Sequence, residues 1–451
     1  MPAAEDHQQG QLFEAAASPA APVAPRSGAK RLRRPERDQL AYEVVCCDRS
    51  IPDDHPVRAV WELVSSLELG VLEDQVQAVE GGPGQAPADP ALLLALWVWA
   101  TIRGVSSARE LDRLCREHLA YRWLCGGVTL NYHTLSDWRS QQGAALEELL
   151  TQLVAALLHQ GLVTLERVAQ DGLRTRASAG TASFRRAPTL TAALAAAEEQ
   201  VARLAAEEAS GTSGREQAAR QRAARDRAER VSQALAELPD IAARKKPGRT
   251  KAGETAEERE KRTAPRASTT DPEARPMKHG DGGFRPSYNV NFATDCGSQV
   301  VVGVMVNNVG SDHGLMRPMA QQVQERCGRR AGAWLADNGY DKHTDLEALE
   351  RSGTVVYLPP QVQRTRTTDR YTAQPGESAV IAGWRARMGT AAAQEIYRER
   401  AATAECVNAQ ARNRGLRLLP VRGLKKVHGV ALLYAVAHNI GRMISLGVKL
   451  V

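Results

Sequence analysis

Three acidic residues that are far apart in the sequence are candidates for a common site. Two predicted strands each end in an aspartate that a glycine follows within two residues, Asp171-Gly172 and Asp337-Asn338-Gly339, and a late predicted helix carries Glu405. Carboxylates at the ends of neighbouring strands can converge, and they repel one another unless a cation lies between them. Oxygen ligands with little else favour Mg²⁺ or Mn²⁺. Two such ions about 4 Å apart support an in-line phosphoryl displacement.

Each of these acids also has an ordinary structural interpretation. An aspartate at a strand end is most often a turn or capping residue, and a glutamate on a helix is usually solvated. Other acidic residues are possible replacements for a member of the three, namely Asp312, Asp341, Glu395 and Glu399. Spacing alone therefore does not decide between a three-acid metal site and ordinary turn, capping or solvated acids.

Composition and charge narrow the class of protein. The 451 residues include 59 Lys and Arg against 52 Asp and Glu, which gives a formal net charge of +7. This surplus favours a polyanionic partner such as nucleic acid. Neither a run of 18 apolar residues nor a signal-peptide pattern occurs, so we predict no membrane segment. Seven scattered cysteines without zinc-ligand spacing are typical of reduced thiols, and we expect a cytoplasmic protein.

Four kinds of segment are predicted along the chain. A basic tail rich in Ala and Pro comes first, and a compact run of amphipathic helices follows it. The rest of the chain is an α/β region that is interrupted by long polar helices. We expect a disordered tail at 1–40, an all-helical DNA-binding domain at 41–161, a catalytic domain made of 162–180 and 276–451, and a helical insertion with a polar linker at 181–275.

The insertion carries a heptad pattern. Apolar residues recur at spacings of three and four from Leu190 to Leu204 and again from Ala224 to Leu238, with Gly211-Thr-Ser-Gly214 between them. Two heptad segments joined by a short turn predict an antiparallel coiled-coil hairpin. Its second arm is rich in arginine, so the hairpin is either a structural spacer or a DNA-contacting arm.

The α/β region alternates predicted strands and helices. One strand, 300–306, is apolar on both faces, which is typical of a central strand. We expect strands at 162–171, 288–294, 300–306, 333–337 and 354–358, and helices at 311–328, 345–350, 390–414 and 428–446. This order predicts a mixed sheet with helices on its faces.

Several segments in register resemble one protein family. In the α/β region they are Gln170–Ser178, Ser268–Lys278, Tyr288–Asn291, Ala336–Tyr340 and Ala404–Arg412; in the helical part they are Pro90–Trp97, Gly104–Leu111, Tyr121–Leu124 and His133–Arg139. Together they resemble the DDE transposases of bacterial insertion sequences. The resemblance covers about residues 45–180 and 265–450, and it says little about the insertion.

The resemblance implies a ribonuclease-H-like catalytic domain in which Asp171, Asp337 and Glu405 bind two divalent metal ions, Mg²⁺ or Mn²⁺. It implies a transposase that binds the terminal inverted repeats of its element, cleaves the ends and joins the 3′-hydroxyls to target DNA. The expected partner is double-stranded DNA, bound by a homodimer or a higher synaptic oligomer in the bacterial cytoplasm, at the nucleoid. Short helices around Ser107–His118 and Thr134–Arg139 are candidates for the DNA-reading elements.

The family also has a Tyr, Arg, Glu, Lys signature along its last catalytic helix. The nearest positions here are Tyr397, Arg400, Glu405 and Arg412, so the chain has arginine in place of the lysine and four residues, not three, between Arg400 and Glu405. On a regular α-helix this spacing puts Arg400 about 140° from Glu405 and Arg398 within about 20° of it. The candidate DNA-binding residues are Tyr397, Arg398, Arg400, Asn408 and Arg412.

Two other functions are compatible with the same sequence. One is a nuclease that only hydrolyses nucleic acid, and the other is a catalytically inactive, DNA-binding descendant that acts as a repressor. Trp334 and Trp384 are candidates for stacking on a flipped base, although core packing is their ordinary role.

Overall fold

The computed structural model of the protein describes residues 46–79, 86–209, 214–244, 253–361 and 369–448. The predicted basic tail at 1–40 and the Gly-Ser turn of the insertion lie outside these residues, apart from Gly214. The described chain forms one compact unit from Cys46 onward.

The N-terminal part is helical, as the sequence predicts, and its helices begin at recognisable caps. The Asp89 side chain accepts a hydrogen bond of 2.7 Å from the Ala91 N–H, and Ser107 accepts one from Glu110. The central helix is apolar all round, and its side chains from Leu92 to Ala100 are buried. In order, the elements are a 3₁₀ turn Asp48–Ser50, α1 Pro56–Ser65, α2 Gly70–Glu73, α3 Pro90–Ile102, α4 Ala108–Glu117, α5 Leu119–Cys125, α6 Tyr132–Gln141 and α7 Gly143–His159.

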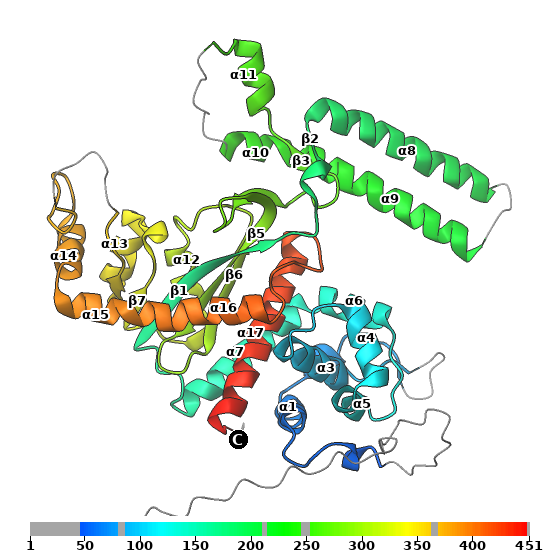
Figure 1. The fold of residues 1–451 in the computed structure, drawn as a ribbon, viewed down its shortest axis with the longest axis horizontal. Coiled ribbons are helices and arrows are strands. Elements are labelled where there is room, and N and C mark those ends of the chain that lie inside the picture. Colours follow the sequence, from blue (N-terminus) through cyan, green and yellow to red (C-terminus); the bar gives the residue numbers. More distant parts are fainter. Residues whose placement is uncertain (1–45, 80–85, 210–213, 245–252, 362–368, 449–451) are drawn as a thin grey trace, which may run out of the picture. The chain divides into compact units, whose positions relative to one another are not determined.

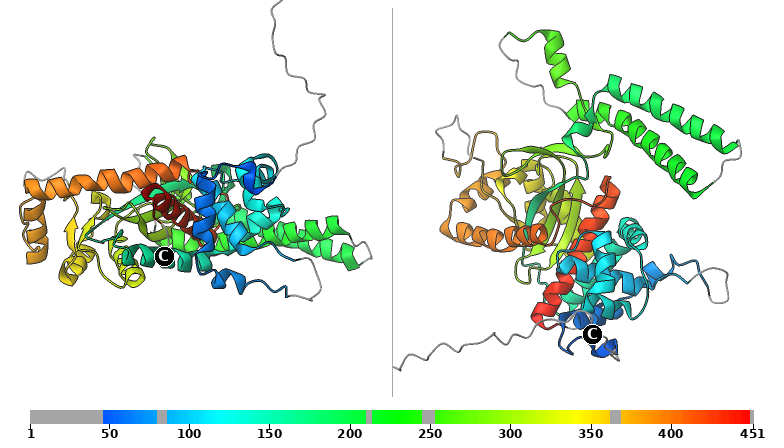
Figure 2. Two further views of the ribbon diagram at one scale, coloured as in Figure 1. Left: turned by 90° about the horizontal axis from the view of Figure 1, so that it is seen from below. Right: turned by 45° about the vertical axis from the view of Figure 1, so that its right-hand side comes forward.

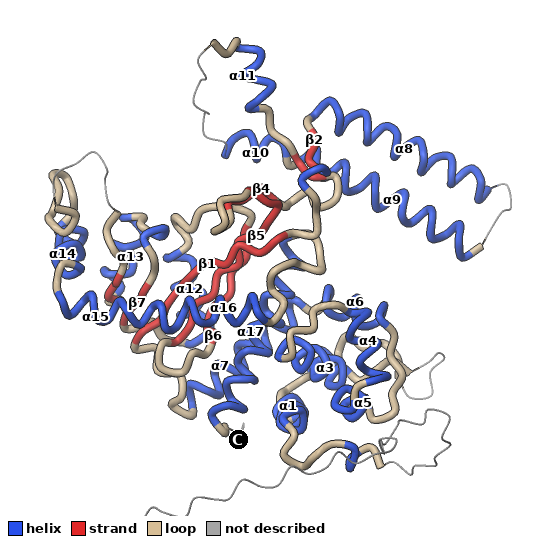
Figure 3. Tube along the Cα trace, viewed as in Figure 1, coloured by secondary structure: helices blue, strands red, loops and turns tan. Residues whose placement is uncertain are grey.

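The last helix, α17 (Leu424–Leu446), joins the helical part to the sheet. It packs against α3 and α7 on one side and against β6 on the other, and these contacts place both regions in one apolar core. Figure 3 shows the helical part and the strands on either side of it. Within the described residues, α17 is also the one helix long and apolar enough to cross a membrane, but most of it is buried in this core.

A six-stranded mixed sheet forms the centre of the α/β region. Its main path has the order β4-β5-β1-β7-β8, and β6 pairs with β5 off this path. β5 is antiparallel to β1, β4 and β6, whereas β7 is parallel to β1 and β8. This arrangement is consistent with the expected ribonuclease-H-like fold. The strands are β1 Arg167–Arg176, β4 Arg275–Lys278, β5 Phe284–Asp295, β6 Val301–Asn307, β7 Ala333–Leu335 and β8 Val355–Tyr357.

The prediction of a strand at 162–171 that ends at a glycine turn is wrong. Leu165 has a positive φ of 55°, so the extended chain starts only at Arg167. The strand then continues past Gly172, because it pairs with β5 as far as Arg176 opposite Ser287. Asp171 therefore lies in the middle of β1, beyond Ala169, the last residue that pairs with β7.

Helices cover the sheet and lead into the site. Where one helix is predicted at 390–414, the chain forms α15 (Ala391–Arg400), a π-helical turn (Ala401–Glu405) and α16 (Cys406–Asn413), which run on as one rod in Figure 2. α14 was not predicted. The other elements are α12 Met316–Cys327, a 3₁₀ turn Asn338–Tyr340, α13 His343–Ser352 and α14 Ala379–Met388.

The insertion contains two long helices, α8 (Ala187–Ala209) and α9 (Arg215–Ala236), which pack against each other (Figure 1). Leu190, Val231 and Ala234 lie in their shared apolar cluster. The predicted polar linker after them is partly helical, because it forms α10 (Leu238–Arg244) and α11 (Ala256–Thr263). A short antiparallel pair, β2 (Phe184–Arg185) with β3 (Ala267–Ser268), brings the two ends of the insertion together.

Candidate active site

The three predicted acids converge on one side chain, the guanidinium group of Arg400. Its Nη2 lies 3.2 Å from Asp171 Oδ1 and 3.8 Å from Asp337 Oδ2, and its Nη1 donates a hydrogen bond of 2.8 Å to Glu405 Oε1. The side chain of Arg400 is only 10% exposed. Three carboxylates from β1, the end of β7 and the α15–α16 rod therefore surround one buried cation.

The π turn explains why Arg400, and not Arg398, reaches Glu405. A π turn closes its hydrogen bond over five residues, and such turns are frequent at functional sites. Arg400 and Glu405 are five residues apart and face each other, so the π turn takes up the extra residue in the signature. The expectation from a regular α-helix is wrong: the exposed Arg398 pairs with Glu395 instead.

Asp337 is held by its own turn. It follows β7 and caps the 3₁₀ turn Asn338–Tyr340, where its Oδ1 accepts a hydrogen bond of 2.8 Å from the Gly339 N–H. Its other oxygen, Oδ2, faces Arg400. The strand-end position that the sequence predicts is therefore correct for this aspartate.

Asn408 and Tyr397 complete the surroundings of the acids. Asn408 lies one turn after Glu405, and its Nδ2 donates a hydrogen bond of 3.0 Å to Asp171 Oδ2. Its Oδ1 is buried and has no partner within the described residues. Tyr397 is half-buried one turn before Arg400. Arg412 is exposed at the end of α16.

The electrostatics of the cluster reflect its burial. Burial raises the pKa of Asp171, and the Arg400 charge opposes this shift without cancelling it. Burial lowers the pKa of Arg400, but the carboxylates of Asp171 and Asp337 contribute to a net upward shift. Arg400 therefore remains a cation, and it compensates for carboxylates that would otherwise repel one another.

The other acids named as replacements fall into two groups. Glu395 pairs with Arg398, and Glu399 pairs with Arg167. Asp341 lies 3.6 Å from a ring nitrogen of His343 and accepts from the Gln361 N–H. None of these three contacts Arg400, whereas Asp312 lies beside Gly172 and thus next to Asp171 in the strand.

The two candidate stacking tryptophans are core residues. Trp334 is 1% exposed, and its indole N–H donates to Gln170 Oε1; Trp384 is fully buried, and its indole donates to the Leu358 carbonyl. Neither ring is available to a nucleotide base.

The donor set fits a divalent metal ion once Arg400 has moved. As the residues stand, the carboxylates face the guanidinium group, and no three acidic, His or Cys side chains in the described part of the chain are grouped closely enough to hold an ion. The same carboxylates, together with the unpartnered Oδ1 of Asn408, are the oxygen ligands that Mg²⁺ and Mn²⁺ favour. A metal ion bound by these carboxylates would take the place that the guanidinium group occupies in this structure.

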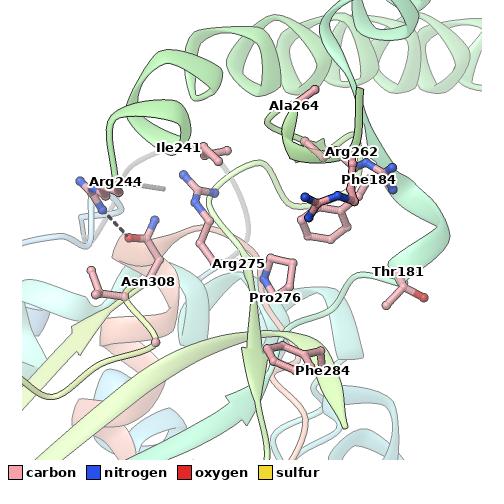
Figure 4. A pocket seen from close by; sticks show the side chains of 13 residues that line it. Thr181, Phe184, Ile241, Arg244, Arg262, Ala264, Arg275, Pro276, Phe284 and Asn308 are labelled. Atoms are coloured by element: carbon pink, nitrogen blue, oxygen red, sulfur yellow. Dashed lines mark hydrogen bonds between the residues drawn. The ribbon is translucent and has the colours of Figure 1, made fainter. Parts of the chain in front are cut away.

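A pocket of about 590 Å³ that is lined by basic residues lies between the insertion and the sheet (Figure 4). Four arginines line it, Arg244, Arg262, Arg266 and Arg275, with Phe184 and Phe284 beside them. Three of these arginines form ion pairs with acidic residues: Arg244 with Asp240, Arg262 with Glu254 and Arg275 with Glu237. The pocket lining also includes Gly310, two residues before Asp312. Arginine with aromatic rings suits the phosphates and bases of a nucleic acid.

Two family models match the chain. A transposase domain (DUF772) matches residues 45–141, which cover α1 to α6, and a transposase DDE domain matches residues 358–444, which include Arg400 and Glu405. Asp171 and Asp337 lie outside both matches. No curated protein and no solved structure matches the chain. Both matched models describe transposase domains, and together they support a DDE transposase of the insertion-sequence type, a metal-dependent enzyme that cleaves and transfers DNA.

Proposed function

We propose that the protein binds the terminal inverted repeats of an insertion sequence, cleaves the element ends and joins the 3′-hydroxyls to target DNA, with Asp171, Asp337 and Glu405 as the catalytic acids. The observation that carries this proposal is the convergence of the three carboxylates on Arg400. The strand order of the sheet supports a ribonuclease-H-like catalytic domain.

The three carboxylates are the groups that would hold two divalent ions, Mg²⁺ or Mn²⁺. Such ions activate a nucleophile and stabilise the leaving oxygen in an in-line displacement at a phosphate. The chain itself orients the acids: the Gly339 N–H fixes Asp337, and Asn408 fixes Asp171. Burial of Asp171 and Arg400 keeps bulk water from screening these charges.

Arg400 has two tasks in this proposal. In the free protein it neutralises the acids, and with metal ions bound its guanidinium group is released toward the DNA backbone. An arginine fork binds phosphate oxygens in a bidentate manner. Exposed Arg412 and half-buried Tyr397 lie on the same rod and are proposed DNA contacts, and Arg398 would contribute only through its exposed charge.

The helical N-terminal part is proposed to recognise the element ends, and a homodimer or higher oligomer would hold two ends together. Arg139 does not serve in base reading here, since it is buried, stacks over Trp97 at 4.5 Å and donates to the Ser106 carbonyl. The exposed residues of α4 (Ala108–Glu117) are the better candidates.

The test compares the parent with Glu405→Gln on DNA that carries the flanking ends of the element, in the presence of Mg²⁺. The glutamine keeps the size of the side chain and removes its charge, so we expect loss of end cleavage of at least about a hundredfold. Glu395→Gln, on the exposed surface of the same rod, is the matched control and should cleave as the parent does. Equal cleavage by Glu405→Gln and the parent would contradict the assignment.

The same assay separates the alternatives. Joined product formed from paired ends and target DNA supports a transposase, whereas cleavage without joining supports a nuclease. An inactive DNA-binding repressor would bind the ends and cut nothing, and Asp171→Asn would leave its behaviour unchanged. The presence of all three acids around one cation argues against that repressor, because an inactive descendant has no need for this costly arrangement.

A further inference from the structure

We propose that Asp312 is a fourth carboxylate of the metal site, that it reaches the other acids across the side-chain-free face of Gly172, and that the buried Asn289 positions it. This inference rests on the proposed function, since it adds a ligand to the same site. Asp312 lies in the loop between β6 and α12, so it comes from a different part of the sheet than the three acids described above.

The position of Asp312 follows from two glycines. A Cβ atom placed on Gly172 would lie 2.6 Å from Asp312 Oδ1, and one placed on Gly339 would lie 3.9 Å from Asp312 Cβ. Gly172 follows Asp171 directly, and Gly339 is two residues after Asp337. Asp312 therefore packs against the backbone beside both aspartates, and at Gly172 it lies in space that the Cβ of any other residue would occupy.

The surroundings of Asp312 are those of a ligand and not of an ion pair. Its Oδ1 accepts a hydrogen bond of 2.6 Å from Asn289 Nδ2, and within the described residues no Lys or Arg pairs with it. The buried Tyr340 hydroxyl is close enough to Asp312, Asp171 and Asp337 that all three charges, after burial itself, contribute to the upward shift of its pKa. Three carboxylates thus act on one buried group, with Arg400 as the opposing charge.

The buried side-chain oxygen of Asn289 lacks a hydrogen-bond partner within the described residues, as expected beside a site that takes up an ion. Asn289 is fully buried on β5, and its Oδ1 has no partner within the described residues, although it lies 2.9 Å from the position of a Cβ on Gly172. An unsatisfied buried oxygen is destabilising, and an ion or a water molecule usually explains it. Asn408 has the same arrangement on the other side: its N–H holds Asp171, and its Oδ1 is unpartnered.

The two asparagines therefore form matching pairs with two aspartates. In each pair the amide N–H fixes a carboxylate, as second ligand layers around metal ions do, and its own oxygen is left without a partner within the described residues. Asp171 with Asn408, and Asp312 with Asn289, supply oxygens from the two faces of the sheet at Gly172. Two ions about 4 Å apart need oxygen ligands on both sides, and in this proposal Asp312 provides them on the side that the three proposed catalytic acids do not reach.

The experiment titrates the full-length protein with Mn²⁺ and follows the free ion by electron paramagnetic resonance. We compare the parent with Asp312→Asn and Gly172→Ala; the second variant changes no ligand but fills the space that Asp312 needs. We expect both variants to weaken the occupancy of one Mn²⁺ by at least about tenfold. Glu325→Gln, an exposed acid on the adjacent α12, is the control and should bind as the parent does.

Asp171→Asn is the arm that tests the proposed function. If Asp171→Asn weakens Mn²⁺ binding and Asp312→Asn does not, the three-acid site stands and the fourth carboxylate is refuted. If neither variant changes Mn²⁺ binding, the metal site itself is misassigned and both proposals fail. Weaker binding in Asp312→Asn and Gly172→Ala, with an unchanged circular dichroism spectrum and the second ion retained, supports the inference.

Discussion

Replacement of Arg400 by methionine should tighten metal binding while it impairs the enzyme. The guanidinium group contacts Asp171, Asp337 and Glu405 at 2.8 to 3.8 Å and occupies the space that an ion between these carboxylates requires. Methionine has a similar length and no charge, so it leaves the acids without their internal cation. In the absence of DNA, Mn²⁺ would then bind without first displacing an arginine.

The contact with Asp171 sets the size of this effect. The side chains of Arg400 and Asp171 are 10% and 18% exposed, so solvent screens this pair weakly, whereas Glu405 is 56% exposed and its contact counts for little. A hydrogen bond to a charged group contributes roughly 1.5–3 kcal/mol. Because 1.4 kcal/mol corresponds to a factor of ten, we expect Arg400→Met to bind Mn²⁺ about 10- to 100-fold more tightly.

Isothermal titration calorimetry with Mn²⁺ measures this change, and thermal unfolding provides a second readout. Without metal, Arg400→Met should be less stable than the parent by about 3 kcal/mol, since it leaves the largely buried carboxylate of Asp171 without its cation, and Mn²⁺ should restore the stability. Arg400→Lys, which keeps the charge, should bind Mn²⁺ nearly as the parent does, and the exposed Arg398→Met is the matched control. Unchanged or weaker Mn²⁺ binding by Arg400→Met would refute competition between arginine and metal.

Three further predictions test the π turn, the basic pocket and a buried histidine. Deletion of the exposed Ala402 shortens the π turn to an α turn and should reduce end cleavage by less than about tenfold. Insertion of one alanine at the same place rotates Arg400 by about 100° relative to Glu405 and should reduce end cleavage by at least about a hundredfold. Equal effects of the two changes would contradict the role of the turn. Arg266→Ala should lower the slope of log affinity against log salt concentration by about 1, measured by fluorescence anisotropy on duplex DNA, and an unchanged slope would exclude a phosphate contact. Burial lowers the pKa of His438 to about 4, so the folded state binds this proton less readily than the unfolded chain, and stability is complete above about pH 6.5 and is lost as the pH falls toward 4. The free energy of unfolding, measured with urea between pH 4.5 and 7.5, should therefore fall by about 3 kcal/mol less in His438→Gln than in the parent. Identical pH profiles of the variant and the parent would show that the histidine is not responsible.

Local signals made the helical part and most strands predictable from the sequence. The caps at Asp89 and Ser107 are formed by contacts within three residues, and the apolar run of α3 is buried however its neighbours are arranged. The position of Asp337 at a strand end was predictable for the same reason, because its turn is closed by the Gly339 N–H two residues later.

The features that the sequence did not reveal depend on long-range contacts. β1 extends through Gly172 only because β5, more than a hundred residues later, pairs with it. The π turn is not visible in the sequence, since an α-helix and a π turn place similar demands on Ala401–Glu405, and its effect is to bring Arg400 to three acids from other elements. Asp312 was named only as a substitute for another acid, because nothing local connects it to Asn289.

The pattern of an aspartate followed by glycine identified the site for a reason other than the expected one. Neither Gly172 nor Gly339 has a positive φ, so neither is required by a turn that only glycine can adopt. A Cβ on Gly172 would lie 2.6 Å from Asp312 Oδ1, and a Cβ on Gly339 would lie 2.8 Å from Asp337 Oδ1. Each glycine thus leaves room for a carboxylate. Because carboxylates repel and a buried one is costly, a chain that keeps such space open beside Asp171 must recover the cost from a cation, and Arg400 supplies that cation in this structure.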